Sequence, residues 1–162
     1  MDLGLKDREK TKKTVDGLNT YLSDLMVLFV KLHNYHWNIV GDDFFEFHEK
    51  LQELYEFVGE EIDRIGERIL MLGYKPVGNL DTALRETTLN EANSVNISAG
   101  NISENVISDF SKVLRQIRDL AGLAGENNDE YTIVLLGDAI GFFEKNIWMF
   151  SAYLSPKRFF KK

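Results

Sequence analysis

The chain has 162 residues, of which 44% are hydrophobic and 28% charged, and this composition excludes a disordered or low-complexity protein. It contains no cysteine, so disulfides, thiolate metal sites and cysteine nucleophiles are excluded. The net charge of −7 argues against a fold built mainly to bind nucleic acid. No apolar run reaches the roughly 20 residues of a membrane span, and the start lacks the apolar core of a signal peptide. We therefore expect a cytoplasmic protein without a membrane partner.

Four long segments have apolar residues at the alternating spacing of three and four that is typical of amphipathic helices. Asp43, followed three residues later by Glu46, predicts a capping box at the start of the second segment. Pro76 and Pro156 follow the second and fourth segments, where a helix cannot continue. The four predicted helices cover about 15–36, 44–72, 98–124 and 129–154.

The connections between these segments decide how the helices are arranged. The joints at 41–43 and 125–129 are short, which predicts antiparallel helical hairpins. The joint from 73 to about 96 is too long to be structureless, and we expect a short extra helix over 82–93. The predicted fold class is therefore all-α, an antiparallel four-helix bundle. It forms a single domain over 1–162, with short basic tails at about 1–13 and 156–162.

All three histidines, His33, His36 and His48, lie on either side of the first predicted hairpin. Because the chain reverses there, His36 and His48 can reach the same depth at one end of the bundle. Asp63 and Glu67 are four residues apart and share one face of the second helix. Two imidazoles with two carboxylates suit iron or zinc rather than magnesium or calcium. Packed histidines and solvated carboxylates are the alternative interpretation of the same spacing.

The length of the second helix restricts how these side chains can meet. His48 and Asp63 are about 22 Å apart along one helix axis, at about 1.5 Å per residue, so no ion can bridge them within one chain. If all four residues bind one metal, Asp63 and Glu67 must come from a second copy. An antiparallel crossing of two such helices about a two-fold axis near their middle would form two equal sites. Gly59 and Gly66 would allow the helices to approach closely.

The di-iron sites built inside four-helix bundles use the motif Glu-x-x-His on two helices. The residues three before the histidines are Val30, His33 and Phe45, and none of them is a glutamate. An iron site formed within one bundle is therefore not expected.

Two blocks of sequence resemble the Dps family of mini-ferritins, the DNA-binding proteins from starved cells. The first block is HNYHWNIVG at 33–41 with FFEFHE at 44–49, and the second is IDRIGER at 62–68 with GYKP at 73–76. A weaker similarity continues into the fourth helix, so the resemblance covers most of the chain. It implies a four-helix subunit with a short helix in the middle connection, assembled with its copies into a hollow dodecamer.

The resemblance also implies a ferroxidase, an enzyme that oxidises Fe(II), at the two-fold interface. Carried over residue by residue, the centre consists of His36 and His48 from one subunit with Asp63 and Glu67 from its neighbour. Hydrogen peroxide is the implied oxidant in preference to oxygen, and Fe(III) is stored as mineral inside the shell. Iron is the implied metal and zinc a competitor. The implied function is iron storage and protection from oxidative stress.

Three further residues are candidates for roles around this centre. The family usually has Asp or Glu four residues after the second histidine, where this chain has Gln52. An amide is a weaker and neutral ligand, so a second iron would be held loosely. Trp37 matches a family tryptophan that takes up an oxidising equivalent, although packing explains it nearly as well. His33 is a candidate for the surroundings of the centre or for a second metal.

The third connection contains Glu126, Asp129 and Glu130, which are candidates for an acidic route by which ions reach the interior. A turn this polar is also typical of a solvated surface.

Two other functions stay open. Basic residues at both ends of the chain could bind DNA phosphates and associate the protein with the nucleoid. Twelve copies would, however, carry twelve times the charge of −7, so DNA binding is not favoured. The bundle could also be a catalytically silent stress protein, which would bind no metal after Fe(II) is added.

Overall fold

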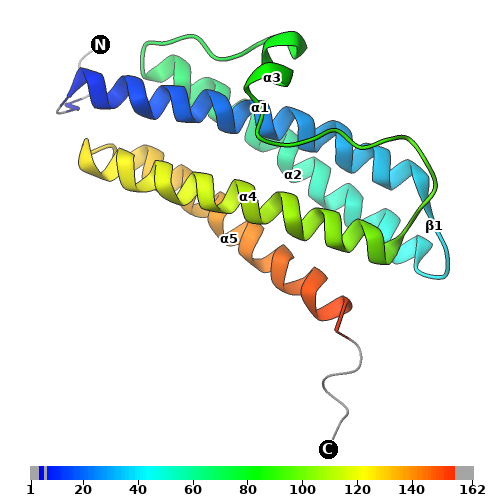
Figure 1. Ribbon diagram of the computed structural model, residues 1–162. Coiled ribbons are helices and arrows are strands. Elements are labelled where there is room, and N and C mark those ends of the chain that lie inside the picture. Colours follow the sequence, from blue (N-terminus) through cyan, green and yellow to red (C-terminus); the bar gives the residue numbers. More distant parts are fainter. Residues whose placement is uncertain (1–3, 6, 156–162) are drawn as a thin grey trace, which may run out of the picture.

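The computed structural model describes residues 4, 5 and 7–155, which form a bundle of four long helices with one short helix outside it (Figure 1). The helices are α1 (Arg8–Asn38), α2 (Phe44–Met71), α3 (Leu80–Glu86), α4 (Ala99–Glu126) and α5 (Glu130–Tyr153). Strands β1 (Ile39–Val40) and β2 (Ile97–Ser98) have two residues each and pair in parallel. The predicted all-α bundle is confirmed. Among the described helices, none is both long and apolar enough to cross a lipid bilayer.

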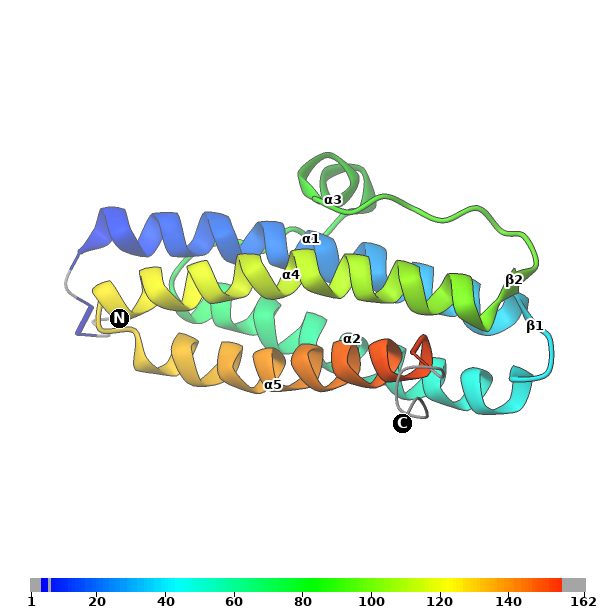
Figure 2. The same cartoon turned by 60° about the horizontal axis from the view of Figure 1, so that its bottom comes forward.

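The bundle consists of two helical hairpins that enclose one core. α1 packs against α2 and α4 packs against α5, while α3 lies outside the bundle on α1 (Figure 2). The apolar 3–4 spacing places one face of each long helix inside, and each buried Leu, Val, Ile or Phe side chain contributes about 1.5–3 kcal/mol. Core side chains that are at most 1% exposed include Leu18, Leu22, Leu51, Leu54, Phe110, Ile117, Leu136 and Phe143.

Two helix ends are closed by backbone hydrogen bonds of the Schellman type. After α2, the N–H of Gly73 donates to Leu70 and the N–H of Tyr74 donates to Ile69. Gly73 has a φ of 85°, a left-handed conformation that glycine adopts without steric cost, so α2 ends where the sequence predicts. α4 ends in the same way, with Asn128 at a φ of 57°.

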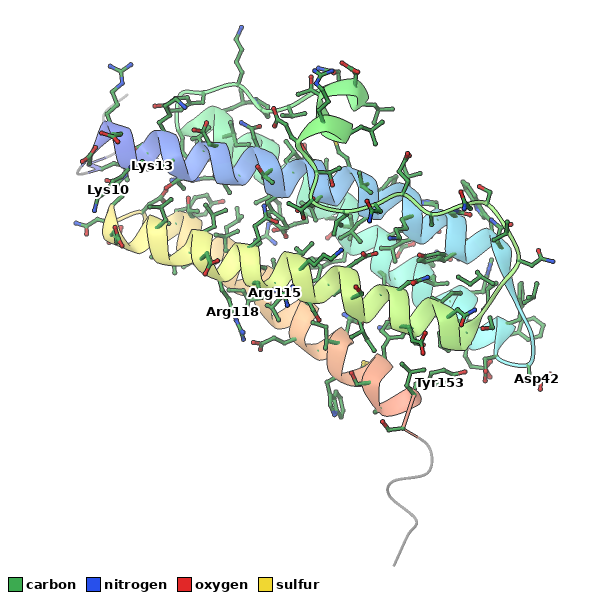
Figure 3. All side chains as sticks on the ribbon, in the orientation of Figure 1. Lys10, Lys13, Asp42, Arg115, Arg118 and Tyr153 are labelled. Atoms are coloured by element: carbon green, nitrogen blue, oxygen red, sulfur yellow. The ribbon has the colours of Figure 1, made fainter. Side chains whose placement is uncertain are left out.

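The capping box predicted at Asp43 and Glu46 does not form. Asp43 occupies the N-cap position of α2, but its side chain makes no cap hydrogen bond. It accepts a hydrogen bond from the Tyr153 hydroxyl at 2.7 Å instead. Tyr153 lies at the end of α5 (Figure 3), so a contact between distant parts of the chain overrides the local pattern.

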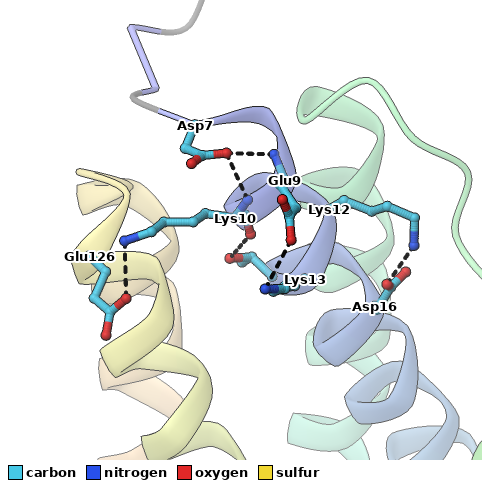
Figure 4. Close-up of polar contacts among 8 residues, drawn as sticks. Asp7, Glu9, Lys10, Lys12, Lys13, Asp16 and Glu126 are labelled. Carbon is cyan, nitrogen blue, oxygen red and sulfur yellow. Dashed lines mark hydrogen bonds and ion pairs between the residues drawn. The ribbon is translucent and has the colours of Figure 1, made fainter.

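α1 begins at Arg8, earlier than the sequence predicts, so residues 8–13 of the expected basic tail are helical. The Asp7 carboxylate caps the helix by accepting hydrogen bonds from the N–H groups of Glu9 and Lys10 at 2.7 and 3.2 Å. The lysines of the first turns form ion pairs (Figure 4), which join Lys10 to Glu126, Lys12 to Asp16 and Lys13 to Glu9. The tail predicted at 156–162 lies outside the described residues.

The middle connection contains the predicted short helix, but α3 covers 80–86 rather than 82–93. Its end is fixed by Asp24 of α1, which is 0% exposed. The Asp24 carboxylate accepts hydrogen bonds from the hydroxyl of Thr87 at 2.7 Å and from the N–H and hydroxyl of Thr88 at 2.6 and 3.0 Å. A buried carboxylate requires such donors, so the chain leaves the helix at Thr87 to supply them.

The rest of the connection is held on α1 by two further polar side chains. Lys31 pairs with Asp109 of α4 at 2.7 Å and donates to the carbonyl of Asn90 at 2.9 Å. Asn34 donates to the carbonyl of Ala92 at 2.9 Å. The connection therefore follows one fixed path along the bundle to β2.

Candidate metal centre

His36 and His48 meet at the end of the bundle where α1 turns into α2. Their rings stack with centroids 3.6 Å apart and planes 20° from parallel. His36 is 8% exposed, and the ring of Phe44 stacks on His48 at 5.2 Å. The antiparallel hairpin thus brings the two histidines together across twelve residues of sequence.

Hydrogen bonds determine which ring nitrogen of each histidine is available to a metal. Nδ1 of His36 lies 2.7 Å from the carbonyl oxygen of His48, and Nδ1 of His48 lies 2.9 Å from the carbonyl oxygen of His36. A carbonyl oxygen can only accept, so each Nδ1 carries the hydrogen and donates it. The lone pair is then on each Nε2, which is how metal-binding histidines are commonly oriented.

The surroundings of His36 also change its pKa. Burial lowers the pKa of His36 below its ordinary value, and the nearby charge of His48 lowers it as well. Two imidazoles in stacking contact repel each other when both are protonated. Because metals bind the neutral imidazole, the lowered pKa of His36 favours the form of that side chain that a cation can bind.

Tyr55 of α2 forms an aromatic wall beside the pair. Its ring contacts His36 edge-on with centroids 5.3 Å apart, and it stacks on His33 at 3.7 Å. His33 donates from Nδ1 to the carbonyl of Phe29 at 2.7 Å, and Trp37 lies 5.4 Å from its ring. His33 is therefore separated from the stacked pair, and Trp37 is 70% exposed.

The sequence did not single out Tyr55 as a site residue. It follows His48 by two helical turns and so lies on the same face of α2. Tyrosine at that spacing is equally typical of a core position, so the signal was present but not specific.

Gln52 lies one turn after His48 and is exposed. Its Nε2 donates a hydrogen bond to Glu56 at 2.7 Å. The amide oxygen, the one atom of this side chain that can bind a cation, has no hydrogen-bond partner in the part of the chain that the structure describes.

Asp63 and Glu67 lie on the exposed surface of α2, toward its other end. Neither carboxylate has a hydrogen-bond or ion-pair partner among residues 4, 5 and 7–155. The neighbouring Arg64 pairs with Glu61 and Asp138 instead. Asp63 and Glu67 line an apolar groove between α1 and α2, so they can bind a ligand that comes from outside the chain.

The four candidate ligands do not form one complete site within a chain. In the described part of the molecule, no three His, Asp or Glu side chains are close enough together to hold a metal ion. The histidine pair, with one residue from α1 and one from α2, instead lies near the start of α2, and the carboxylate pair lies farther along α2.

The three acidic residues of the α4–α5 connection have different surroundings. Asp129 is 3% exposed, pairs with Arg68 at 2.6 Å and caps α5 by accepting hydrogen bonds from the N–H and hydroxyl of Thr132. Glu126 is exposed and pairs with Lys10, and Glu130 is exposed. Asp129 is thus occupied by structural contacts, whereas Glu126 and Glu130 face solvent.

Comparison with known proteins gives the family. The model of the family described as ferritin-like domain matches residues 15–158. A protein of Helicobacter pylori named DNA protection during starvation protein is 32% identical over 143 residues, which cover 88% of this chain and 99% of that protein. The crystal structure of antigen TpF1 from Treponema pallidum matches with a TM-score of 0.92 and 32% identity, over 96% of this chain and 99% of that one.

A Dps protein from Vibrio cholerae O1, described as a member of a broad superfamily of ferritin-like diiron-carboxylate proteins, matches with a TM-score of 0.89 and 34% identity. The match covers 96% of this chain and 97% of that one. Sequence and structure agree over nearly the whole chain, and the chain therefore belongs to the ferritin-like family and, within it, to the Dps proteins.

Proposed function

We propose that the protein is a ferroxidase that oxidises Fe(II) at sites shared between two subunits and stores Fe(III) as mineral inside a hollow dodecamer. In each site, His36 and His48 of one subunit act with Asp63 and Glu67 of its partner. Such an assembly consumes Fe(II) and hydrogen peroxide in the same reaction and so protects the cell from oxidative stress.

One observation carries the proposal. Two imidazoles are fixed with both Nε2 atoms available, while two carboxylates without partners among the described residues lie farther along α2, the helix that carries His48. Unused metal ligands of complementary type at two levels of one subunit are what a two-fold site requires, because each subunit must supply one half of each site.

The donor set suits the oxidation of iron. Imidazole nitrogens bind Fe(II) well, and anionic carboxylate oxygens favour the more highly charged Fe(III). With hydrogen peroxide as oxidant, two Fe(II) and two protons are consumed and two Fe(III) and two water molecules form. Because peroxide takes both electrons, one from each iron, no hydroxyl radical is released. Zn(II) prefers similar ligands and is expected to inhibit.

Gln52 affects how strongly each shared site would bind a second iron. A neutral amide oxygen in place of a carboxylate gives less attraction for a cation, so we infer that the second iron binds more weakly than the first. Glu126 and Glu130 are proposed to lie along the route by which Fe(II) enters, because both remain accessible on the described surface.

Mixing two inactive variants tests whether the sites are shared. One variant carries His36→Ala and His48→Ala, and the other carries Asp63→Ala and Glu67→Ala, so each removes one half of every site. Each variant alone should lose peroxide-dependent Fe(II) oxidation. After the two are unfolded and refolded together, mixed dimers should contain one intact site each, which restores about one quarter of the wild-type rate.

The control is a mixture of the Asp63→Ala, Glu67→Ala variant with a Glu60→Gln, Asp63→Ala variant, in which every site lacks a carboxylate. That mixture should stay inactive. If the first mixture stays inactive although mass spectrometry shows mixed oligomers, the shared site is ruled out.

A further inference from the structure

The hydroxyl of Tyr21 lies inside the bundle against a carboxyl group. Tyr21 of α1 is 0% exposed, and its hydroxyl donates a hydrogen bond to Oε1 of Glu61 on α2 at 3.4 Å. Glu61 is also 0% exposed, and its other oxygen, Oε2, accepts from Arg64 at 3.2 Å. A phenol and a carboxyl group thus share a hydrogen bond in the core, with the acceptor held in place by an arginine.

Such a pair can release an electron and a proton together. Burial, and after it the negative charge of Glu61, raise the pKa of Tyr21 well above its ordinary value, so the resting side chain is a neutral phenol. A phenol that loses an electron becomes a strong acid, because its ring then carries a positive charge. The proton can pass along the existing hydrogen bond to Oε1 of Glu61, which leaves a neutral tyrosyl radical inside the core.

Two other tyrosines have only one of the two features of this pair. The hydroxyl of Tyr153 donates to the Asp43 carboxylate at 2.7 Å, but Tyr153 is 38% exposed. Tyr35 is 3% exposed, but the side chain that forms a hydrogen bond with its hydroxyl is the amide of Asn105, which is not a base. Among the described tyrosines, burial and a carboxylate acceptor therefore occur together at Tyr21.

Tyr21 lies near the carboxylate half of the proposed metal site. Glu61, its hydrogen-bond partner, comes two residues before Asp63 on α2. A helix with its side chains is about 10–12 Å across, so an electron from Tyr21 crosses about one helix to reach iron held by Asp63 and Glu67. Electrons cross such a distance readily through packed protein.

A site that holds a single iron creates the need for such an electron. Reduction of hydrogen peroxide to two water molecules takes two electrons, and one Fe(II) gives only one. A lone Fe(II) therefore converts peroxide into hydroxide and a hydroxyl radical. Because Gln52 weakens the binding of the second iron, sites with one iron are expected whenever Fe(II) is scarce.

We propose that Tyr21 supplies the second electron at sites that hold one Fe(II). The inference rests on the proposed ferroxidase function and deepens it. Fe(II) and Tyr21 each give one electron to hydrogen peroxide, which takes up two protons from solvent and forms two water molecules. The phenol proton moves to Glu61, and the products are Fe(III), protonated Glu61 and the tyrosyl radical.

The next Fe(II) restores the pair. It gives one electron to the tyrosyl radical, and the proton returns from Glu61 to the Tyr21 oxygen. Over both steps, two Fe(II), one hydrogen peroxide and two protons give two Fe(III) and two water molecules, as at a site that holds two irons. Tyr21 thus extends the same reaction to scarce iron without release of a hydroxyl radical.

Electron paramagnetic resonance of rapidly frozen samples tests the proposal. The assembled protein is loaded anaerobically with one Fe(II) per site and mixed with hydrogen peroxide. The wild type should show a tyrosyl radical whose spectrum changes when the protein is made with ring-deuterated tyrosine. Tyr21→Phe should lose this signal, whereas Tyr153→Phe, which removes the exposed hydroxyl with a carboxylate partner, should keep it.

Three results of this experiment would overturn a role for Tyr21. They are a wild type without a tyrosyl radical, a signal that persists in Tyr21→Phe, and a radical confined to Trp37, which deuterated tyrosine does not change. Fe(II) oxidation followed in the same samples separates the two proposals. If the wild type oxidises Fe(II) normally and one of these results is found, only the role of Tyr21 is wrong; if it does not oxidise Fe(II), the ferroxidase function is wrong as well.

Spin trapping of hydroxyl radical provides the second arm. With one Fe(II) per site, Tyr21→Phe and Glu61→Gln should both release trapped radical that the wild type does not, because the first lacks the donor and the second lacks the proton acceptor. With two Fe(II) per site, both variants should match the wild type, which a general loss of structure would not allow. If both variants match the wild type at one Fe(II) per site, the proposal is wrong.

Discussion

Glu61 is one of the buried carboxylic acids that do not belong to the candidate centre. Glu61 of α2 is 0% exposed, and it accepts hydrogen bonds from the Tyr21 hydroxyl at 3.4 Å and from Arg64 at 3.2 Å. Burial raises the pKa of Glu61 from 4.5 to about 7, because its charged form loses contact with water, and the positive charge of Arg64 opposes this only in part. The core therefore contains a group that titrates near neutral pH.

Glu61→Gln tests this residue through the pH dependence of stability. Between pH 4.5 and about 7 the folded protein keeps a proton that the unfolded chain has lost, so the free energy of unfolding falls as the pH rises through this window. Glutamine cannot ionise, so the variant should gain up to about 3 kcal/mol over the wild type from pH 4.5 to pH 8. Urea unfolding at fixed protein concentration measures this gain.

Glu60, the exposed residue before Glu61, offers a matched control for the stability measurement. Glu60→Gln should shift the unfolding midpoint equally at both pH values. A wild-type stability that does not fall between pH 4.5 and pH 8 relative to Glu61→Gln would contradict the raised pKa.

Between elements, the buried pair of Arg68 and Asp129 joins α2 to the α4–α5 hairpin. The guanidinium donates to Asp129 at 2.6 Å and to the Thr132 hydroxyl at 2.8 Å, and Arg68 is 5% exposed. Tyr131 covers the guanidinium, with its ring centroid 5.1 Å away. Because the partners come from different helices, this contact fixes how the second hairpin sits on the first.

Asp129→Ala should destabilise the protein by about 3–5 kcal/mol, because it leaves the Arg68 charge buried and unpaired and removes the cap of α5. Thermal unfolding measures this loss. Glu130→Ala, at the exposed next residue, should change stability by less than about 0.5 kcal/mol. If the two variants unfolded at the same temperature, the structural role of Asp129 would be refuted.

At the scale of the whole molecule, the distribution of positive charge decides whether the protein binds DNA. Three lysines of α1, Lys10, Lys12 and Lys13, are paired with carboxylates at one end of the bundle (Figure 4). Arg115 and Arg118 lie farther along α4 (Figure 3), where Arg118 pairs with Glu144. These ion pairs neutralise part of the positive charge of the described surface, and the net charge of each chain is −7.

We expect the assembled protein to sediment at twelve times the mass of the 18.7-kDa chain and to leave plasmid DNA unretarded at physiological salt. Repulsion from phosphates outweighs the few unpaired cations of the described surface. Gel retardation at several salt concentrations measures this. Retardation that disappears on deletion of 156–162 would instead assign DNA binding to the end of the chain.

The sequence by itself determined the helices and the donor types. Apolar spacing, Gly73 and Pro76 define α2 almost to the residue, because helix propensity and end signals are local properties. The distance between His48 and Asp63 along one helix likewise follows from the rise per residue alone. The prediction of imidazoles and carboxylates as the candidate ligand set needed no coordinates.

Only the tertiary structure decided which polar side chains form structural contacts and which remain available to a ligand. Asp43 bonds to Tyr153 rather than capping α2, Asp129 is buried against Arg68, and Glu61 lies in the core. Each outcome depends on a partner more than sixty residues away or on burial by other helices, and such partners leave no local pattern. The same holds for the hydrogen bonds that leave Nε2 of both histidines available, because they form only when the hairpin closes.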